Sequence, residues 1–133
     1  MPILALIAVL AISQYLLFGA LTGRARARSG LKAPVMTGDE GFERMYRVQM
    51  NTLEVLIAFL PAVYLAALFW PAYLVAPVAA VYLVGRHLFW RAYVSDPAKR
   101  GLGFMLSIVP VFALLVLALL GAGWALIAGD APF

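Results

Sequence analysis

The stretch FERMYRVQMNTLE, residues 42–54, decides how this chain folds. A segment without charged residues follows it from Val55 to Gly85, and no glycine or proline interrupts residues 42–60, which predicts one continuous helix. On that helix Arg47, Asn51 and Glu54 are spaced i, i+4 and i+7, and therefore share one face. Since a charge at mid-bilayer depth costs roughly 3 kcal/mol or more, such groups usually face a partner or a cavity.

A purely structural interpretation of this face is also open. Arg47 and Glu54 are able to pair across neighbouring helices and hold a bundle together. The full spacing Arg-x-x-x-Asn-x-x-Glu, with Glu43 and Arg44 directly before it, favours a ligand site over an isolated pair.

The composition indicates an integral membrane protein. The chain has 133 residues, of which 65% are hydrophobic and 12% charged, against roughly 45–50% and about 25% in soluble domains. There is no cysteine, so a disulfide, a thiolate metal site and a catalytic thiol are excluded, and a sulfur nucleophile must come from a substrate. The net charge of +4 is confined to short segments that suit membrane orientation, so nucleic acid is not an expected partner.

The predicted fold is all-α: an integral membrane, four-helix, up-down bundle that forms a single domain over residues 1–133. The four helices are expected at about residues 3–22, 42–69, 72–94 and 102–127, with a first loop at residues 23–41. Because every Lys and Arg lies near one end of the bundle, both basic loops are expected in the cytoplasm and both termini outside. Abundant Ala, Leu and Arg favour a bacterial inner membrane, although the endoplasmic reticulum remains open.

The third helix carries a second polar face. Arg86, Phe89 and Tyr93 are spaced i, i+3 and i+7. His87 points elsewhere and is expected to be an interfacial residue rather than a ligand or a base. Arg100 follows a helix break at Pro97.

These residues together resemble a known family. The pattern resembles the MAPEG family, the membrane-associated proteins of eicosanoid and glutathione metabolism, at Phe42, Glu43, Arg44, Tyr46, Arg47, Gln49, Asn51 and Glu54, then Gly85, Arg86, Phe89 and Tyr93, then Asp96, Pro97 and Arg100. The resemblance implies a homotrimer of four-helix subunits that binds glutathione between neighbouring subunits near the cytoplasmic face. It also implies a lipophilic second substrate that arrives from the bilayer, and no metal.

The resemblance assigns roles residue by residue. Arg100 matches the arginine that stabilises the glutathione thiolate, which makes it the expected catalytic residue. The expected glutathione-binding residues are Arg47, Gln49, Asn51, Glu54, Arg86, Tyr93 and, when the first loops are aligned without a gap, Arg26.

Elementary chemistry agrees with these roles. An arginine forks onto a carboxylate with two hydrogen bonds, so Arg47 suits one carboxylate of glutathione. Glu54 suits its ammonium group, and Asn51 suits its peptide amides. A free thiol has a pKa of about 8.5 that a nearby guanidinium lowers, which is the role expected of Arg100.

The sequence departs from the family at positions that narrow the activity. Phe89 stands where several members have a ligand-contacting tyrosine, and Gly101 and Phe104 stand where the prostaglandin synthase branch has hydroxyl residues. The expected activity is therefore a glutathione transferase or peroxidase.

Two other function classes stay open. One is a non-catalytic lipid-binding scaffold, like the lipoxygenase-activating protein of the same family. The other is a small multidrug transporter, which needs an isolated carboxylate, whereas Glu54 has Arg47 two turns away on its own face. Turnover of glutathione with an aryl halide or a lipid hydroperoxide separates these classes from the enzyme.

Overall fold

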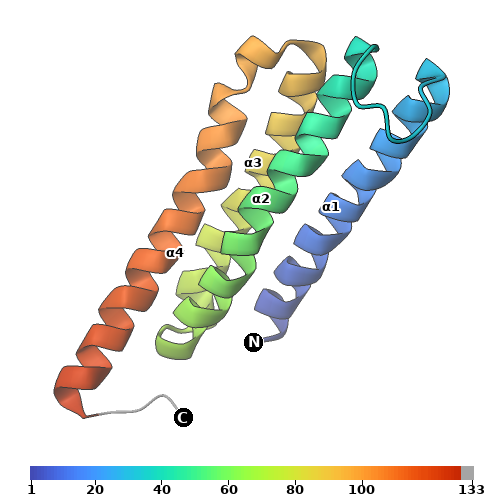
Figure 1. Ribbon diagram of the computed structural model, residues 1–133. Helices are drawn as coiled ribbons and strands as arrows, with labels where there is room; N and C mark the ends of the chain where they lie inside the picture. Colours follow the sequence, from blue (N-terminus) through green and yellow to red (C-terminus); the bar gives the residue numbers. More distant parts are fainter. Residues whose placement is uncertain (130–133) are drawn as a thin grey trace.

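Four long helices and one short 3-10 turn make up the computed structural model, which describes residues 1–129 (Figure 1). The elements are α1 (Pro2–Ser29), α2 (Glu40–Phe69), α3 (Ala72–Ser95), the 3-10 turn η1 (Pro97–Lys99) and α4 (Gly101–Ala128). The all-α, four-helix prediction is therefore confirmed. Residues 130–133, the end of the expected domain, lie outside the described residues.

The helices run up and down, with α2 and α3 between α1 and α4 (Figure 1). The α1–α2 loop and η1 lie at one end of the bundle, and the α2–α3 turn lies at the other. All ten Lys and Arg residues belong to residues 24–47 or 86–100, so they gather toward the first of these ends. We call it the basic end.

All four long helices are long and apolar enough to cross a membrane. Their outer faces carry large exposed apolar side chains, among them Leu16, Phe112, Leu119 and Leu126. A soluble protein rarely exposes so much contiguous apolar surface. These features are those of an integral, multi-pass membrane protein.

The first helix is longer than the sequence predicted. It was expected to end near residue 22, but α1 continues to Ser29, so Arg24, Arg26 and Arg28 lie on the helix and not in a loop. Arg and Ala are strong helix formers and carry the helix past Gly23 to Gly30, whose φ of 76° ends it in the left-handed conformation. The loop is correspondingly short, and α2 begins after Asp39, whose side chain accepts a hydrogen bond from the Phe42 amide at 2.9 Å.

Two glycines allow α3 and α4 to pack backbone against backbone. A Cβ atom on Gly85 would lie 2.5 Å from the Leu106 carbonyl carbon, and one on Gly103 would lie 2.3 Å from the Phe89 nitrogen. Small residues of this kind let helices approach closely in membranes. The contact fixes the start of α4 against the middle and end of α3, next to the polar residues described below.

Candidate functional site

A polar hollow of about 280 Å³ opens between α2, α3 and the start of α4 near the basic end. This polar hollow is lined by Arg47 and Asn51 of α2, Phe89 and Tyr93 of α3, and Arg100 and Phe104 at the start of α4. Ligand pockets usually measure about 300–1,000 Å³, so the hollow alone approaches the lower limit. Four of the residues predicted from the sequence thus meet at one place.

Arg86 lies directly behind this hollow. Its side chain is 0% exposed, the largest fully buried side chain of the bundle. Its Nε donates to Ser107 Oγ at 2.7 Å, and its Nη1 donates to Asn51 Oδ1 at 2.8 Å and to Thr52 Oγ1 at 3.3 Å. The guanidinium also lies over the Phe89 ring, 4.3 Å from its centroid. A buried cation thereby ties α2, α3 and α4 together below the polar hollow.

This network fixes the orientation of the Asn51 amide. An arginine side chain has donors only, so the atom of Asn51 that faces Arg86 must be its oxygen. The amide nitrogen of Asn51, with two hydrogens, is then left to serve the hollow that the residue lines. Asn51 therefore presents donors, which suit a carbonyl or carboxylate oxygen of a ligand. Arg86 itself is buried and does not line the hollow. It acts on the hollow only through its hydrogen bond to Asn51.

Arg100 occupies the junction between η1 and α4. Its Nη1 donates to the Pro97 carbonyl at 2.8 Å, which holds the side chain over the turn while it lines the polar hollow. Arg100 is also the N-cap residue of α4, and the first amides of a helix carry a partial positive charge. A guanidinium and a helix N-terminus together favour an anion such as a thiolate. Within residues 1–129, no group of three or more Asp, Glu or His side chains is placed to hold a metal ion.

The other residues predicted for the site lie outside the polar hollow. Glu54 is exposed on the same face of α2 as Arg47, about 10 Å further along the helix by its rise. Gln49 faces α1, because its amide nitrogen is 3.4 Å from where a Cβ atom on Gly19 would lie. Arg26 binds its own loop, donating to the Val35 carbonyl at 2.7 Å and lying 4.4 Å from the centroid of the Phe42 ring.

Several residues that support the site were not found from the sequence. Thr52 and Ser107 are buried partners of Arg86, but a lone hydroxyl gives no signal until the helix pairing is known. Arg44 donates to the Val94 and Ser95 carbonyls, each at 3.1 Å, and pairs with Glu40. Arg44 therefore links the start of α2 to the end of α3.

Comparison with known proteins gives a consistent result. Residues 4–120 match the profile of the MAPEG family. The chain is 43% identical to an uncharacterized protein of Synechocystis sp. over 92% of its own length and 89% of that protein. It is 33% identical to microsomal glutathione S-transferase 2 of Mus musculus over 90% of this chain and 81% of that protein. Leukotriene C4 synthase of Bos taurus is 31% identical over 73% of this chain and 65% of that synthase.

Proposed function

This chain belongs to the MAPEG family, and we propose that it is a membrane-bound glutathione transferase or peroxidase. Its substrates would be glutathione and either a lipophilic electrophile or a lipid hydroperoxide. The observation that carries this proposal is the convergence of Arg47, Asn51, Tyr93 and Arg100 on one hollow at the basic end. Relatives named as glutathione S-transferases align over most of the chain and support it.

The donors around the polar hollow complement glutathione. The tripeptide carries two carboxylates, two peptide carbonyls, one ammonium group and one thiol. Arg47 would bind a carboxylate through two parallel hydrogen bonds, and the Asn51 amide nitrogen would donate to a carbonyl. Glu54 would bind the ammonium group from its position deeper on the same face. The Tyr93 hydroxyl would add one more hydrogen bond.

A single chain leaves this site incomplete, which favours a homotrimer. Gln49 and Arg26 lie on the α1 side of the molecule, away from Arg47 and Asn51. One subunit would contribute the polar hollow and its neighbour would contribute Gln49 and Arg26, with glutathione between them. Both basic loops would face the cytoplasm, where Lys and Arg are retained. Native mass spectrometry is expected to give the mass of three chains; monomers and dimers alone would contradict this assembly.

The chemistry would be carried by the thiolate of the bound glutathione. Arg100 and the N-terminus of α4 would stabilise its negative charge, while the thiol proton leaves to solvent. In the transferase reaction, sulfur bonds to an electrophilic carbon and the leaving group departs with its electron pair. In the peroxidase reaction, sulfur takes the terminal oxygen of the hydroperoxide and releases an alcohol. A second glutathione then reduces the sulfenic acid, which yields the disulfide and water.

Calorimetry of glutathione binding tests the proposal. The Arg47→Ala variant is expected to lose about 2 kcal/mol of binding free energy, the usual value for a hydrogen bond to a charged group. Lys99→Ala is the matched control, since Lys99 is an exposed cation at the same end and does not line the polar hollow. Wild-type affinity in Arg47→Ala would reject the site. Binding without turnover of either an aryl halide or a lipid hydroperoxide would favour the scaffold.

A further inference from the structure

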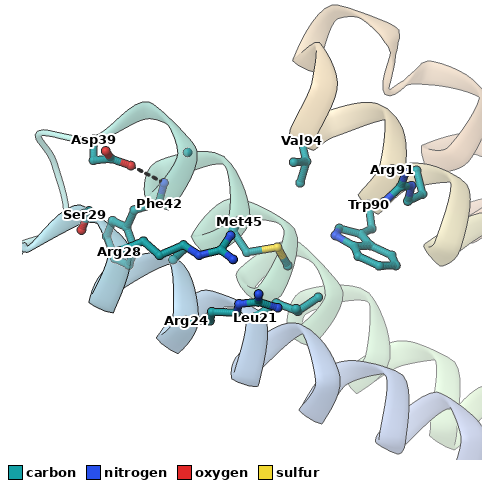
Figure 2. A pocket seen from close by; sticks show the side chains of 12 residues that line it. Leu21, Arg24, Arg28, Ser29, Asp39, Phe42, Met45, Trp90, Arg91 and Val94 are labelled. Carbon is teal, nitrogen blue, oxygen red and sulfur yellow. Dashed lines mark hydrogen bonds between the residues drawn. The ribbon is translucent and has the colours of Figure 1, made fainter.

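Two further hollows follow one another along α1 and α3, and together we call them the α1–α3 groove. The upper hollow measures about 370 Å³ and lies at the basic end (Figure 2). The lower hollow measures about 360 Å³ and lies further along the same two helices. Trp90 lines both, so the two hollows adjoin at this residue. We propose that this α1–α3 groove binds one anionic phospholipid of the leaflet at the basic end.

The upper hollow has the charge to hold a lipid phosphate. Arg24 and Arg28 are one turn apart on α1, and Arg91 lies on α3 across from them (Figure 2). Among residues 1–129, these three arginines form no ion pair. Asp39 is the one carboxylate in the lining, and its Oδ1 already accepts the Phe42 amide. Three guanidinium groups against one carboxylate leave a positive excess, and arginine forks suit phosphate oxygens.

The lower hollow suits an acyl chain. Its lining is mainly apolar, from Leu10, Leu17 and Phe18 of α1 and Leu83 of α3. Gln14 of α1 donates to the Leu83 carbonyl of α3 at 3.0 Å, which links the two helices at this level. From Arg24 to Leu10 the helix rises about 21 Å. This length covers the depth of one leaflet, since half of the hydrocarbon core is roughly 15 Å.

Trp90 marks the boundary between the headgroup and the chain. Its ring packs 5.4 Å from that of Phe18 and 5.4 Å from that of His87. The Arg91 guanidinium, which lines the upper hollow, lies 5.4 Å from the centroid of the Trp90 ring. Tryptophan prefers the depth of the lipid headgroups, and basic pockets between membrane helices bind anionic headgroups. Arginines, Trp90 and apolar side chains therefore follow one another along the groove in the order of the phosphate, the headgroup boundary and the acyl chain of a phospholipid.

The α1–α3 groove is separate from the proposed glutathione site. From α2 the upper hollow takes Gly41, at the start of the helix, and Phe42 and Met45, which belong to its buried face. Arg47 and Glu54 are exposed about half a turn away around the helix. The lipid would therefore occupy the opposite side of α2 from the polar hollow, and every residue of its site comes from one chain.

Native mass spectrometry of the purified full chain tests this proposal. Protein in mixed micelles with equal amounts of phosphatidylglycerol and phosphatidylcholine is expected to retain phosphatidylglycerol preferentially. The variant Arg28→Gln with Arg91→Gln is expected to lose this preference by roughly tenfold or more, since each cation near an anionic headgroup contributes appreciably. The matched control is Lys32→Gln with Lys99→Gln, which removes the same charge at exposed positions outside the groove. An equal loss in both variants would mean general surface attraction and would overturn the proposal.

Two further experiments distinguish a bound lipid from a bound small anion. Leu10→Trp places a large ring in the lower hollow at an exposed position, and is expected to lower phosphatidylglycerol retention while all three arginines remain. Glycerol phosphate, the headgroup without its chains, is expected to compete only at far higher concentration than the lipid. Competition at equal concentration, or unchanged retention in Leu10→Trp, would make this a small-anion site and contradict the proposal. Displacement by glutathione would assign the groove to glutathione instead.

Discussion

The polar hollow and the α1–α3 groove lie at the same end of the bundle, but they hold their cations in different ways. Behind the polar hollow, Arg86 is buried and makes three hydrogen bonds to side chains from α2 and α4. In the groove, Arg24 and Arg28 are exposed and form no ion pair within the described part of the chain. In the polar hollow the Asn51 amide is oriented by Arg86 before a ligand arrives, whereas the arginines of the groove are free to adjust.

This difference matches the ligands that we propose. A reaction needs the thiolate and its partner held in a defined geometry, and preorganised donors lower the entropy lost on binding. A phospholipid only needs its phosphate near several cations and its chain in an apolar groove, so mobile arginines suffice. Substitutions that affect one site and spare the other therefore test the comparison.

The largest effect is expected at the seam between α3 and α4. Gly103→Ala would place a Cβ atom 2.3 Å from the Phe89 nitrogen, a contact that only a shift of the backbone can relieve. We expect a loss of about 3 kcal/mol of unfolding free energy, at the upper end of overpacking costs, measured by denaturant titration in mixed micelles. Glutathione binding should fall with it, because Arg100 and Phe104 move with α4. Phosphatidylglycerol binding should fall less than glutathione binding, because the groove uses no residue of α4.

The matched control is Gly123→Ala on the same helix. A Cβ atom there meets nothing within 4 Å. Alanine is a better helix former than glycine by roughly 0.5–1 kcal/mol, so this variant should be at least as stable as the wild type. Equal stability of the two variants would show that the seam is not tightly packed.

The second largest effect is expected at Glu54, the carboxylate on the polar face of α2. Glu54→Gln keeps the size of the side chain and removes the charge that would bind the ammonium group of glutathione. Its affinity for glutathione should fall by about 2 kcal/mol, or roughly 30-fold, in calorimetry. Glu40→Gln is the control, since Glu40 pairs with Arg44 away from the hollow. If the two variants bind glutathione equally well, the Glu54 carboxylate takes no part in binding glutathione.

The sequence was sufficient for the fold and for most of the polar hollow. Composition gave the four membrane helices, and the i, i+4, i+7 spacing put Arg47, Asn51 and Glu54 on one face of α2. The predicted end of the first helix near residue 22 is wrong, because helix propensity carries α1 through its arginines to Ser29.

The contacts between helices could not be predicted in the same way. The burial of Arg86 depends on Ser107, a residue 21 positions away on another helix. Periodicity tells which residues of one helix share a face, but it does not tell which face of α3 meets α4. The close approach at Gly103 sets that register, and it depends on the relative position of both backbones.

Arg86 offers a smaller and more selective test of the comparison. Arg86→Leu removes the donor that orients the Asn51 amide, without removing any residue that lines the hollow. Glutathione affinity should fall by roughly tenfold, about the value of one hydrogen bond, while Arg86→Lys, which keeps a donor, recovers part of it. Phosphatidylglycerol retention should not change in either variant. Wild-type affinity in Arg86→Leu would show that Asn51 needs no fixed orientation.

The smallest effect on affinity is expected at Arg100, which we assign to the thiolate and not to anchoring. The residue is exposed and held by the Pro97 carbonyl at the rim of the hollow, where a thiol that extends from bound glutathione would meet it. In Arg100→Ala, glutathione should bind almost as in the wild type, while the pKa of its thiol rises toward the free value of about 8.5 and turnover at neutral pH falls. Each unit of that rise corresponds to about 1.4 kcal/mol of lost thiolate stabilisation.

Thiolate absorbs in the near ultraviolet, so a pH titration of the complex measures the shift directly. Lys99→Ala removes the neighbouring cation and should leave both the titration and the turnover unchanged. If Arg100→Ala also shows the wild-type titration and turnover, the guanidinium has no part in the chemistry, and the helix N-terminus of α4 would be left to stabilise the anion without it.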